Sequence, residues 1–182
     1  IESQSVKIFR WVIIENDSID GSDSFLNSMP DLSNVDKVYI LKLNFYNTSY
    51  QLGIKYSTII NYAFDFVKSK AFFNDLDYIG ILDADCHPEQ NYYKTLISHF
   101  LNDNLLGICS GVIRYPDNTV ECSNSDHARG GCRVWRIACF NDSPYAVGLS
   151  ADSIASAKAI INGWKVMSFD DAVVFSRKVG SR

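Results

Sequence analysis

No apolar run in the sequence approaches the roughly 20 residues that a helix needs to span a bilayer. The 182 residues contain no internal repeat and no low-complexity tract, and they include 4 Pro and 10 Gly. No linker therefore divides the chain, and its length is near the roughly 100–150 residues of one domain. With 47% hydrophobic and 13% aromatic residues, the chain can form a sizeable core. These features predict a single globular domain over residues 1–182.

A surplus of basic residues is also absent. Lys and Arg number 17 against 21 Asp and Glu, which gives a net charge of −4 at pH 7. A nucleic-acid-binding domain usually carries a basic surplus or stripe, so we expect no nucleic-acid partner. Most of the acidic residues are Asp, a residue common in loops, helix caps and metal sites. The composition therefore favours a protein rich in loops.

Paired cysteines are missing as well. The 5 Cys are odd in number and form no C-x-x-C motif. In a chain of this length, such cysteines are typical of free thiols in a reducing compartment. The three His have no zinc-ligand spacing to the Cys, which argues against a zinc site. We therefore expect a cytoplasmic protein, and a peripheral position at the inner membrane face is compatible with the sequence.

Short apolar runs alternate with amphipathic stretches along the chain. The apolar runs predict strands at residues 9–15, 37–43, 78–82, 106–115, 134–140, 164–169 and 172–175. The 3.6-residue spacing of apolar side chains predicts helices at residues 56–70, from Pro88 onward, and at 152–162, where Gly163 follows as a terminator. This alternation predicts an α/β domain with a mixed, mainly parallel sheet covered by helices on both faces.

In such sheets, ligands bind at the carboxyl ends of the strands. Acidic residues lie at three of these ends: Glu15, Asp17 and Asp20 after the first strand, Asp83 and Asp85 after residues 78–82, and Asp152 at a late helix start.

The Asp-x-Asp pattern alone is weak evidence, because chance supplies about one or two such pairs in a chain this rich in Asp. Asp75 and Asp77 form a second pair, but they precede a strand, where turn or cap duty is the natural role. Asp83 and Asp85 end that strand. Two carboxylates so close repel, and a divalent metal would relieve the repulsion. The alternative is that Asp83 and Asp85 cap the following helix.

Five segments, in order, resemble the motifs of family 2 glycosyltransferases. The family's second-strand signature is similar to residues 11–22, WVIIENDSIDGS. Its metal and nucleotide segment resembles residues 77–97, DYIGILDADCHPEQNYYKTLI, and its next strand resembles residues 106–115. The catalytic-helix segment is similar to residues 151–166, in which Asp152 stands eleven positions before Gly163. The closing loop resembles residues 172–182, so the resemblance spans nearly the whole chain.

The resemblance implies a GT-A fold, a Rossmann-like α/β domain that binds a UDP- or GDP-sugar with Mn²⁺ or Mg²⁺ and inverts the anomeric centre. Position by position, it implies a nucleotide-base contact at Glu15, with Ser18 or Asp20 lining the same pocket. It implies a ribose contact at Asp83 and metal ligation at Asp85. Asp152 would be the general base that deprotonates an acceptor hydroxyl, on a glycan, a lipid-linked acceptor or a protein.

Weaker candidates complete the predicted nucleotide site. Arg177 and Lys178 follow the last strand and could close over the diphosphate, but a solvated pair near the chain's end is about as plausible. Lys55, with Gly53, resembles a short family segment before a helix, although a surface Lys and a loop Gly are the alternatives. His87, two residues after Asp85, could reach the metal, but a turn at Pro88 would direct it to solvent.

Two further segments lie near the predicted acceptor side. Trp164 could form an acceptor shelf, but a Trp that opens a buried strand is more often part of the core. Residues 129–131, Arg-Gly-Gly, predict a flexible loop that could be mobile until substrate binds.

The sequence departs from the family's pattern at three places. Phe175 stands where the closing loop often has a metal-binding His. Ala151 stands where many members carry an acidic or aromatic neighbour of the base. The family's first strand, which normally lies inside the sheet, has no counterpart, so we expect an N-terminal piece outside this sequence, with a C-terminal piece as a further option.

Two other functions remain open at this point. Phe175 and the missing strand would suit a degenerate domain that binds a nucleotide-sugar or a glycan without transferring it. A sugar nucleotidyltransferase shares the sheet type, but it should have a Gly-rich phosphate loop, which this sequence does not contain. An enzyme needs Asp85 and Asp152 in one cleft, whereas a surface binding module does not.

Overall fold

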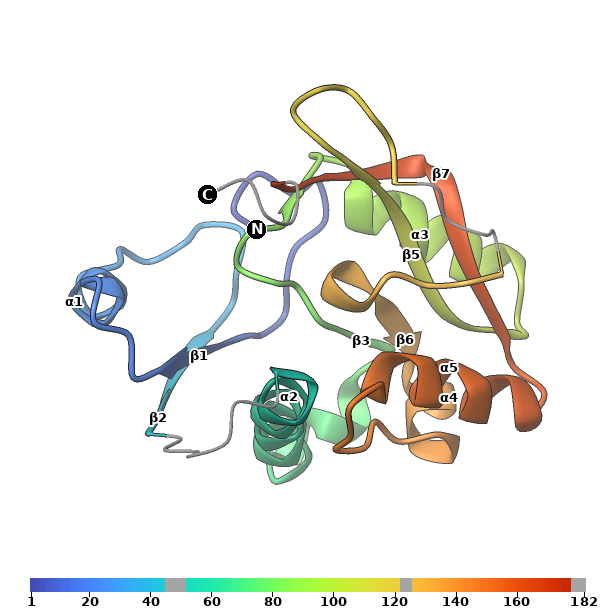
Figure 1. Ribbon diagram of the computed structural model, residues 1–182, viewed down its shortest axis with the longest axis horizontal. Helices are drawn as coiled ribbons and strands as arrows, with labels where there is room; N and C mark the ends of the chain where they lie inside the picture. The colour runs from blue at the N-terminus through green and yellow to red at the C-terminus, as the bar shows by residue number, and fades with distance from the viewer. Residues whose placement is uncertain (45–51, 122–125, 178–182) are drawn as a thin grey trace.

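The computed structural model describes residues 1–44, 52–121 and 126–177 (Figure 1). Two sheets and five α-helices are formed in the described part of the chain. In order, the elements are β1 (Trp11–Asn16), α1 (Ser22–Asn27), β2 (Val38–Leu43), α2 (Leu52–Lys68), η1 (Ala71–Asp75), β3 (Tyr78–Gly80), β4 (His87–Pro88), α3 (Tyr92–Asn102), β5 (Leu106–Arg114), η2 (Gly130–Cys132), β6 (Val134–Arg136), α4 (Ile137–Asp142), α5 (Ala151–Ile161) and β7 (Lys165–Phe175).

The larger sheet has five strands in the order β3-β6-β5-β7-β4. Its long ladder, β5 with β7, is parallel, and the short pairings β3–β6, β6–β5 and β7–β4 are antiparallel. Successive residues of β5 point to opposite faces, as strand geometry requires. Ile108 packs into a cluster with α2, α4 and α5, whereas Cys109 packs into a cluster with α3. Helices therefore cover both faces, and the predicted mixed α/β class is confirmed.

The smaller sheet is a parallel pair, β1 with β2, that is not hydrogen-bonded to the larger one. Figure 1 shows this pair, with α1, on one side of the molecule and the five-stranded sheet on the other. Beyond Asn16 the chain turns through Asp17, whose φ is 54°, and Gly21, whose φ is 91°, before α1 begins. The carboxyl end of β1 therefore opens into a tight turn, where the sequence predicts part of the nucleotide site.

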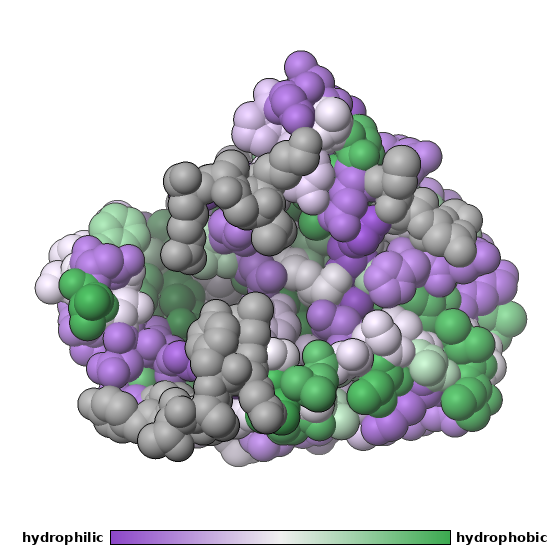
Figure 2. Space-filling model, in the orientation of Figure 1, coloured by the Kyte–Doolittle hydropathy of each residue, from purple (hydrophilic) through white to green (hydrophobic). Residues whose placement is uncertain are grey.

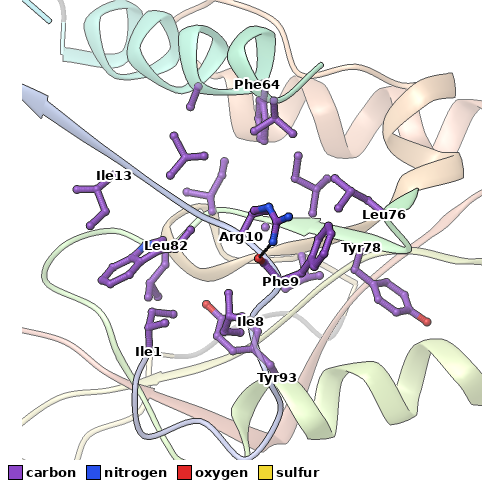
Figure 3. Close-up of a pocket in the computed structure, with 18 of the residues that line it drawn as sticks. Ile1, Ile8, Phe9, Arg10, Ile13, Phe64, Leu76, Tyr78, Leu82 and Tyr93 are labelled. Carbon is purple, nitrogen blue, oxygen red and sulfur yellow. Dashed lines mark hydrogen bonds between the residues drawn. The ribbon is translucent and has the colours of Figure 1, made fainter. Parts of the chain in front are cut away.

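A cavity of about 830 Å³ separates the two sheets. Figure 3 shows its lining: Ile8 and Ile13 come from the β1 side, Leu82 from the β3 side, Phe64 from α2 and Tyr93 from α3. Among the described residues, β1 pairs with β2 alone and β3 with β6 alone, so the two strand edges that flank the cavity are unpaired. The sequence predicts a missing first strand inside the sheet, and that expectation stays a prediction.

Residues 134–140 do not form one strand, contrary to the sequence prediction. β6 ends at Arg136, and α4 continues directly from Ile137. Helical geometry brings Cys139 and Phe140 together into the core cluster beneath α5, where both are buried. A short apolar run has the same composition in a strand as in a buried helix, so its periodicity could not separate the two.

The helix predicted from Pro88 begins at Tyr92 instead. His87 and Pro88 form β4, which pairs with Phe175 and Val174 of β7. β4 is an edge strand of the sheet, where Pro88, which has no amide hydrogen, is tolerated. The two strands predicted at the end of the chain are one strand, β7, whose pairing with β5 shifts register near Gly111.

Helix α5 ends as the sequence predicts, because Gly163 adopts a φ of 86° directly after the capping residue Asn162. Its outer face and the loop before it leave large apolar side chains exposed: Val147, Leu149, Ile154, Ile160 and Ile161. Figure 2 shows hydrophobic surface along this side of the molecule.

Candidate active site

Asp83 and Asp85 lie in the segment that follows β3. The Asp83 amide donates to the carbonyl oxygen of Gly131 (2.7 Å), and the Asp83 carbonyl accepts from the amide of Cys86 (3.0 Å). This turn leaves the side chain of Asp83 half-buried and that of Asp85 exposed. The alternative of helix capping is not adopted, since α3 begins at Tyr92, whose amide bonds to the Glu89 carbonyl.

Asp152 lies in the first turn of α5. A carboxylate at that end interacts favourably with the helix dipole. The Tyr145 hydroxyl donates to Asp152 Oδ1 (3.2 Å). The side chain of Asp152 remains about one-third exposed, so it is anchored on one side and open to solvent on the other.

The Gly130–Gly131 turn lies between Asp83 and Asp152. A Cβ atom on Gly130 would be 2.2 Å from Asp152 Oδ2, and one on Gly131 would be 2.3 Å from Asp83 Oδ2. A side chain at either position would force the facing carboxylate to move, because real Cβ atoms do not approach an oxygen so closely. Consecutive Cα atoms are about 3.8 Å apart. The structure therefore brings two predicted site carboxylates together against two consecutive residues of one turn.

Two tyrosines position these carboxylates, and sequence reasoning missed both. Tyr56 of α2 donates to Asp83 Oδ1 (2.8 Å), as Tyr145 does to Asp152. Burial raises the pKa of Tyr56, and the charges of Asp83 and Asp152 raise it further. The pKa of Tyr145 is raised by burial and by Asp152. Both hydroxyls therefore stay protonated and act as donors over the physiological pH range.

The three site carboxylates interact electrostatically. Burial raises the pKa of Asp83, the Tyr56 hydrogen bond opposes that shift, and the charges of Asp85 and Asp152 add to it. Like charges that cannot separate make each other harder to ionise. Asp83, near the carboxyl end of β3, thus interacts with the charges of both Asp85 and Asp152.

The predicted base-binding residues lie apart from these carboxylates in the sequence, in the turn after β1. Glu15 is buried, and its Oε1 accepts from the amide of Ser18 (2.6 Å). That hydrogen bond is the main cause that lowers the pKa of Glu15. Asp20 Oδ1 accepts from the amide and the hydroxyl of Ser22 at the start of α1 (3.0 and 2.6 Å). These carboxylates shape the turn, and their contacts with a nucleotide stay predictions.

The remaining candidates have simpler surroundings. Lys55 lies in α2 beside Tyr56 and is half-buried, and Arg177 is exposed two residues beyond β7. Lys178 falls outside the described residues. The indole nitrogen of Trp164 donates to Asp142 (3.1 Å), and its ring packs against the core cluster of α4 and α5. The structure therefore gives Trp164 a core contact, as the plainer interpretation of the sequence expected.

His87 and Phe175 are direct cross-strand partners in the β4–β7 ladder. Side chains paired in this way lie on the same face of a sheet. Phe175 stands at the position where the closing loop of the resembled family often has a His. The structure thus brings a His of this chain beside that position, from a different strand, and both residues are exposed.

A hard divalent cation prefers oxygen ligands and is commonly held by one or two carboxylates, substrate phosphates and water. Within the described ranges, no three His, Cys, Asp or Glu side chains are grouped closely enough to hold a metal ion. Asp85, with Asp83 beside it, would supply the carboxylate share of such a site. This donor set fits Mn²⁺ or Mg²⁺ completed by a diphosphate, and it does not fit a metal enclosed by protein ligands alone.

In the part of the chain that the structure covers, no helix combines the length and apolar character of a membrane span.

No protein-family model matches this sequence, and no curated protein sequence matches it. The fold is similar to that of solved structures. Residues 1–349 of TarS from S. aureus superpose with a TM-score of 0.67 at 13% identity, over 97% of this chain and 54% of that one. Mannosyltransferase PcManGT from Pyrobaculum calidifontis, in complex with GDP-Man and Mn²⁺, gives 0.62 at 15% identity, over 91% and 46%.

GalNAc-T7, solved with UDP, GalNAc and Mn²⁺, gives a TM-score of 0.58 at 11% identity, over 96% of this chain and 44% of that one. This chain therefore spans about half the length of each of these three glycosyltransferase chains. It has a GT-A-like glycosyltransferase fold, which agrees with the mixed sheet and the helices on both of its faces.

Proposed function

We propose that this chain is an inverting, metal-dependent glycosyltransferase domain of the family 2 type. It would transfer a sugar from a UDP- or GDP-sugar to an acceptor hydroxyl. The observation that carries the proposal is the packing of Asp83 and Asp152 against Gly130 and Gly131. A transferase needs a donor site and a base within one reaction distance of each other, and this turn supplies the close approach.

The residues divide into two roles. Asp83 would bind a ribose hydroxyl, and Asp85 would hold Mn²⁺ or Mg²⁺ against the diphosphate. When bound, the cation would stabilise the leaving diphosphate as a Lewis acid. Asp152 would accept the proton of the attacking hydroxyl, and Tyr145 keeps its carboxylate oriented through Oδ1. Attack from the side opposite the leaving group inverts the anomeric carbon.

The nucleotide base would bind near the turn after β1, which Glu15, Ser18 and Asp20 shape. Lys55 and Arg177 would contact the diphosphate. A hexose is the sugar class we propose for the donor, because the PcManGT structure holds GDP-Man and the GalNAc-T7 structure holds UDP and GalNAc. The acceptor is a glycan, a lipid-linked molecule or a protein, and we propose that the reaction takes place in the cytoplasm.

Calorimetry with UDP and with GDP, each with and without Mn²⁺, tests the donor half of this proposal. We expect one nucleotide to bind only when Mn²⁺ is present, and Asp85→Asn to abolish that binding. The matched control is Asp77→Asn, which alters the other Asp-x-Asp pair at an exposed side chain and should leave affinity unchanged.

If folded protein binds neither nucleotide, the proposal is wrong. If it binds a nucleotide but turns over no UDP- or GDP-sugar, with water or with added acceptor, the degenerate binding domain replaces the enzyme. Retention of the anomeric configuration in the product, read by NMR, would contradict the inverting mechanism.

A further inference from the structure

Arg133 is fully buried, at 0% exposure, between the Gly130–Gly131 turn and α5. Its guanidinium donates to the carbonyl oxygens of Ala128 (2.6 Å) and Arg129 (3.2 Å), on the chain that leads into the turn. It also donates to the carbonyl oxygen of Asp152 (3.0 Å) and to the hydroxyl of Ser156 (3.4 Å), in the first turns of α5. One side chain thus ties together the two elements that contact at the site.

A buried guanidinium is costly to the fold unless its charge and its donors find partners. Asp152 is the carboxylate within ion-pair range of Arg133, with 3.9 Å between Oδ1 and the guanidinium nitrogen Nη2. The ring of Trp135 lies 5.5 Å from the guanidinium carbon and adds a cation–π contact. Burial lowers the pKa of Arg133, and the charge of Asp152 opposes that shift.

We propose that Arg133 is a positioning residue that holds the Asp152 carboxylate in place against the glycine turn, and so sets its distance from the donor side at Asp83. This inference rests on the proposed function, because it gives Asp152 the role of base. Arg133 lies behind the turn with no exposed surface, so it acts through Asp152 and touches no substrate.

Arg136, at the other end of β6, offers a matched control. It donates to three backbone carbonyl oxygens, those of Phe100, Asp103 and Leu106, and its guanidinium lies over the ring of Phe100. Its anchoring is therefore similar in kind to that of Arg133, but it ties α3 to β5 and contacts no residue of the site. If weakened packing alone lowered kcat, substitution of either arginine should lower it to a similar extent.

The test compares Arg133→Lys with Arg136→Lys in the full chain. Both variants keep the charge and lose the planar fork of donors, and thermal unfolding measures the structural cost of each. For the donor identified by calorimetry, we expect Arg133→Lys to lower kcat by about 10- to 100-fold, as a misplaced catalytic group does. The KM for the donor and the affinity for nucleotide with Mn²⁺ should stay within about 2-fold, since Asp83 and Asp85 are untouched.

Arg136→Lys should leave kcat within about 2-fold of wild type, whatever its cost in stability. A double-mutant cycle adds a second readout: in an Asp152→Asn background, the effect of Arg133→Lys on the residual rate should disappear. The inference is overturned if both arginine variants lower kcat equally, or if Arg133→Lys lowers the residual rate of Asp152→Asn as much as that of wild type.

Amide hydrogen exchange tests the role of Arg133 independently of the proposed function. Arg133→Lys should speed exchange in the first turn of α5 and in residues 128–131, whereas Arg136→Lys should speed it at the end of α3. If no nucleotide binds to wild type, the proposed function fails, and exchange still tests the positioning of Asp152. Unchanged exchange in α5 would overturn the role of Arg133. If Arg133→Lys does not fold, Ser156→Ala removes one partner and should show the same pattern more weakly.

Discussion

The two sheets differ in how completely their residues are buried. Seven of the nine residues of β5 are buried, whereas in β1 Glu15 is the one buried residue and β2 has none. Helices cover the five-stranded sheet on both faces, while one edge of β1 borders the cavity between the sheets. Asp83 and Asp152 are positioned around the well-packed sheet, and the predicted nucleotide-base residues lie on the less buried pair.

This difference indicates that the carboxylates proposed for the general base and the ribose contact are stabilised separately from those proposed for the nucleobase contact. The carboxylates are held by hydrogen bonds that come from other elements, Tyr56 to Asp83 and Tyr145 to Asp152. Glu15, in contrast, is held by Ser18 three residues away. Hydrogen bonds between distant parts of the chain keep a site rigid only as long as the core is intact. A local turn is stabilised mainly by its own residues.

The largest expected effect separates the two regions by function. Asp152→Asn should lower kcat by about 1,000-fold or more, because it removes the proposed base, while nucleotide affinity stays nearly unchanged. Glu15→Gln should do the reverse and weaken nucleotide binding with little change in kcat. Steady-state kinetics and calorimetry on the same preparations measure both. Transfer at the wild-type rate by Asp152→Asn would contradict the assignment of the base.

The second effect comes from the glycine turn. Gly130→Ala and Gly131→Ala each place a methyl group against a site carboxylate, so we expect kcat to fall by about 100-fold. Gly148→Ala is the matched control, because its added carbon would meet Ile154 at 3.6 Å, an ordinary contact. Its kcat should be that of wild type. If all three variants behave alike, then closeness to the carboxylates is not what the turn requires.

A matched pair of isoleucines tests the difference in packing. Ile108 in β5 is fully buried, whereas Ile13 in β1 is half-buried beside the cavity. Ile108→Ala should lower the free energy of unfolding by about 2–5 kcal/mol, and Ile13→Ala by about 1 kcal/mol. Denaturant titration measures both. Equal losses would mean that the two sheets unfold as one equally packed unit.

The smallest effect is a pair of opposite pH dependences. The pKa of Asp83 is raised mainly by burial, so its contribution to stability falls as the pH rises above the ordinary Asp range. The pKa of Glu15 is lowered mainly by the Ser18 amide. The Glu15 carboxylate contributes to stability at pH values above the ordinary pKa range of Glu. This contribution is lost as the pH falls through the lowered pKa.

Unfolding curves for wild type, Asp83→Asn and Glu15→Gln between about pH 3 and pH 7 measure these contributions. Relative to wild type, Asp83→Asn should gain stability as the pH rises, and Glu15→Gln should lose it. The same sign for both variants would contradict the separate environments of the two carboxylates.

Local sequence patterns predicted the elements that have a regular spacing of apolar residues or a residue that ends the helix. The strands near residues 9–15 and 37–43, the helix at 56–70 and the helix ended by Gly163 are all confirmed, with boundaries shifted by a few residues. The strand-end rule pointed to Asp83, the helix-start position and the family resemblance pointed to Asp152, and the structure brings the two together. Their chemical roles stay predictions, because a role depends on a bound substrate as well as on position.

Other features depend on partners that are distant in the sequence. Tyr56 contacts Asp83 from 27 positions away, and an isolated Tyr in a helix carries no local signal of such a contact. Arg133 directly precedes the short strand β6, at a position where a charged residue suggests an exposed site, yet it is fully buried. The pairing of His87 with Phe175 required β4, a strand of two residues that no pattern predicts.

The cavity between β1 and β3 also bears on how the protein behaves at high concentration. Each of the two strands beside it has one edge that is unpaired within the described chain, and an open strand edge is a template for pairing with another molecule. Association through such edges follows mass action and grows with concentration. The unfolding experiments therefore need a series of protein concentrations, and the dilute end of that series reports on the single chain.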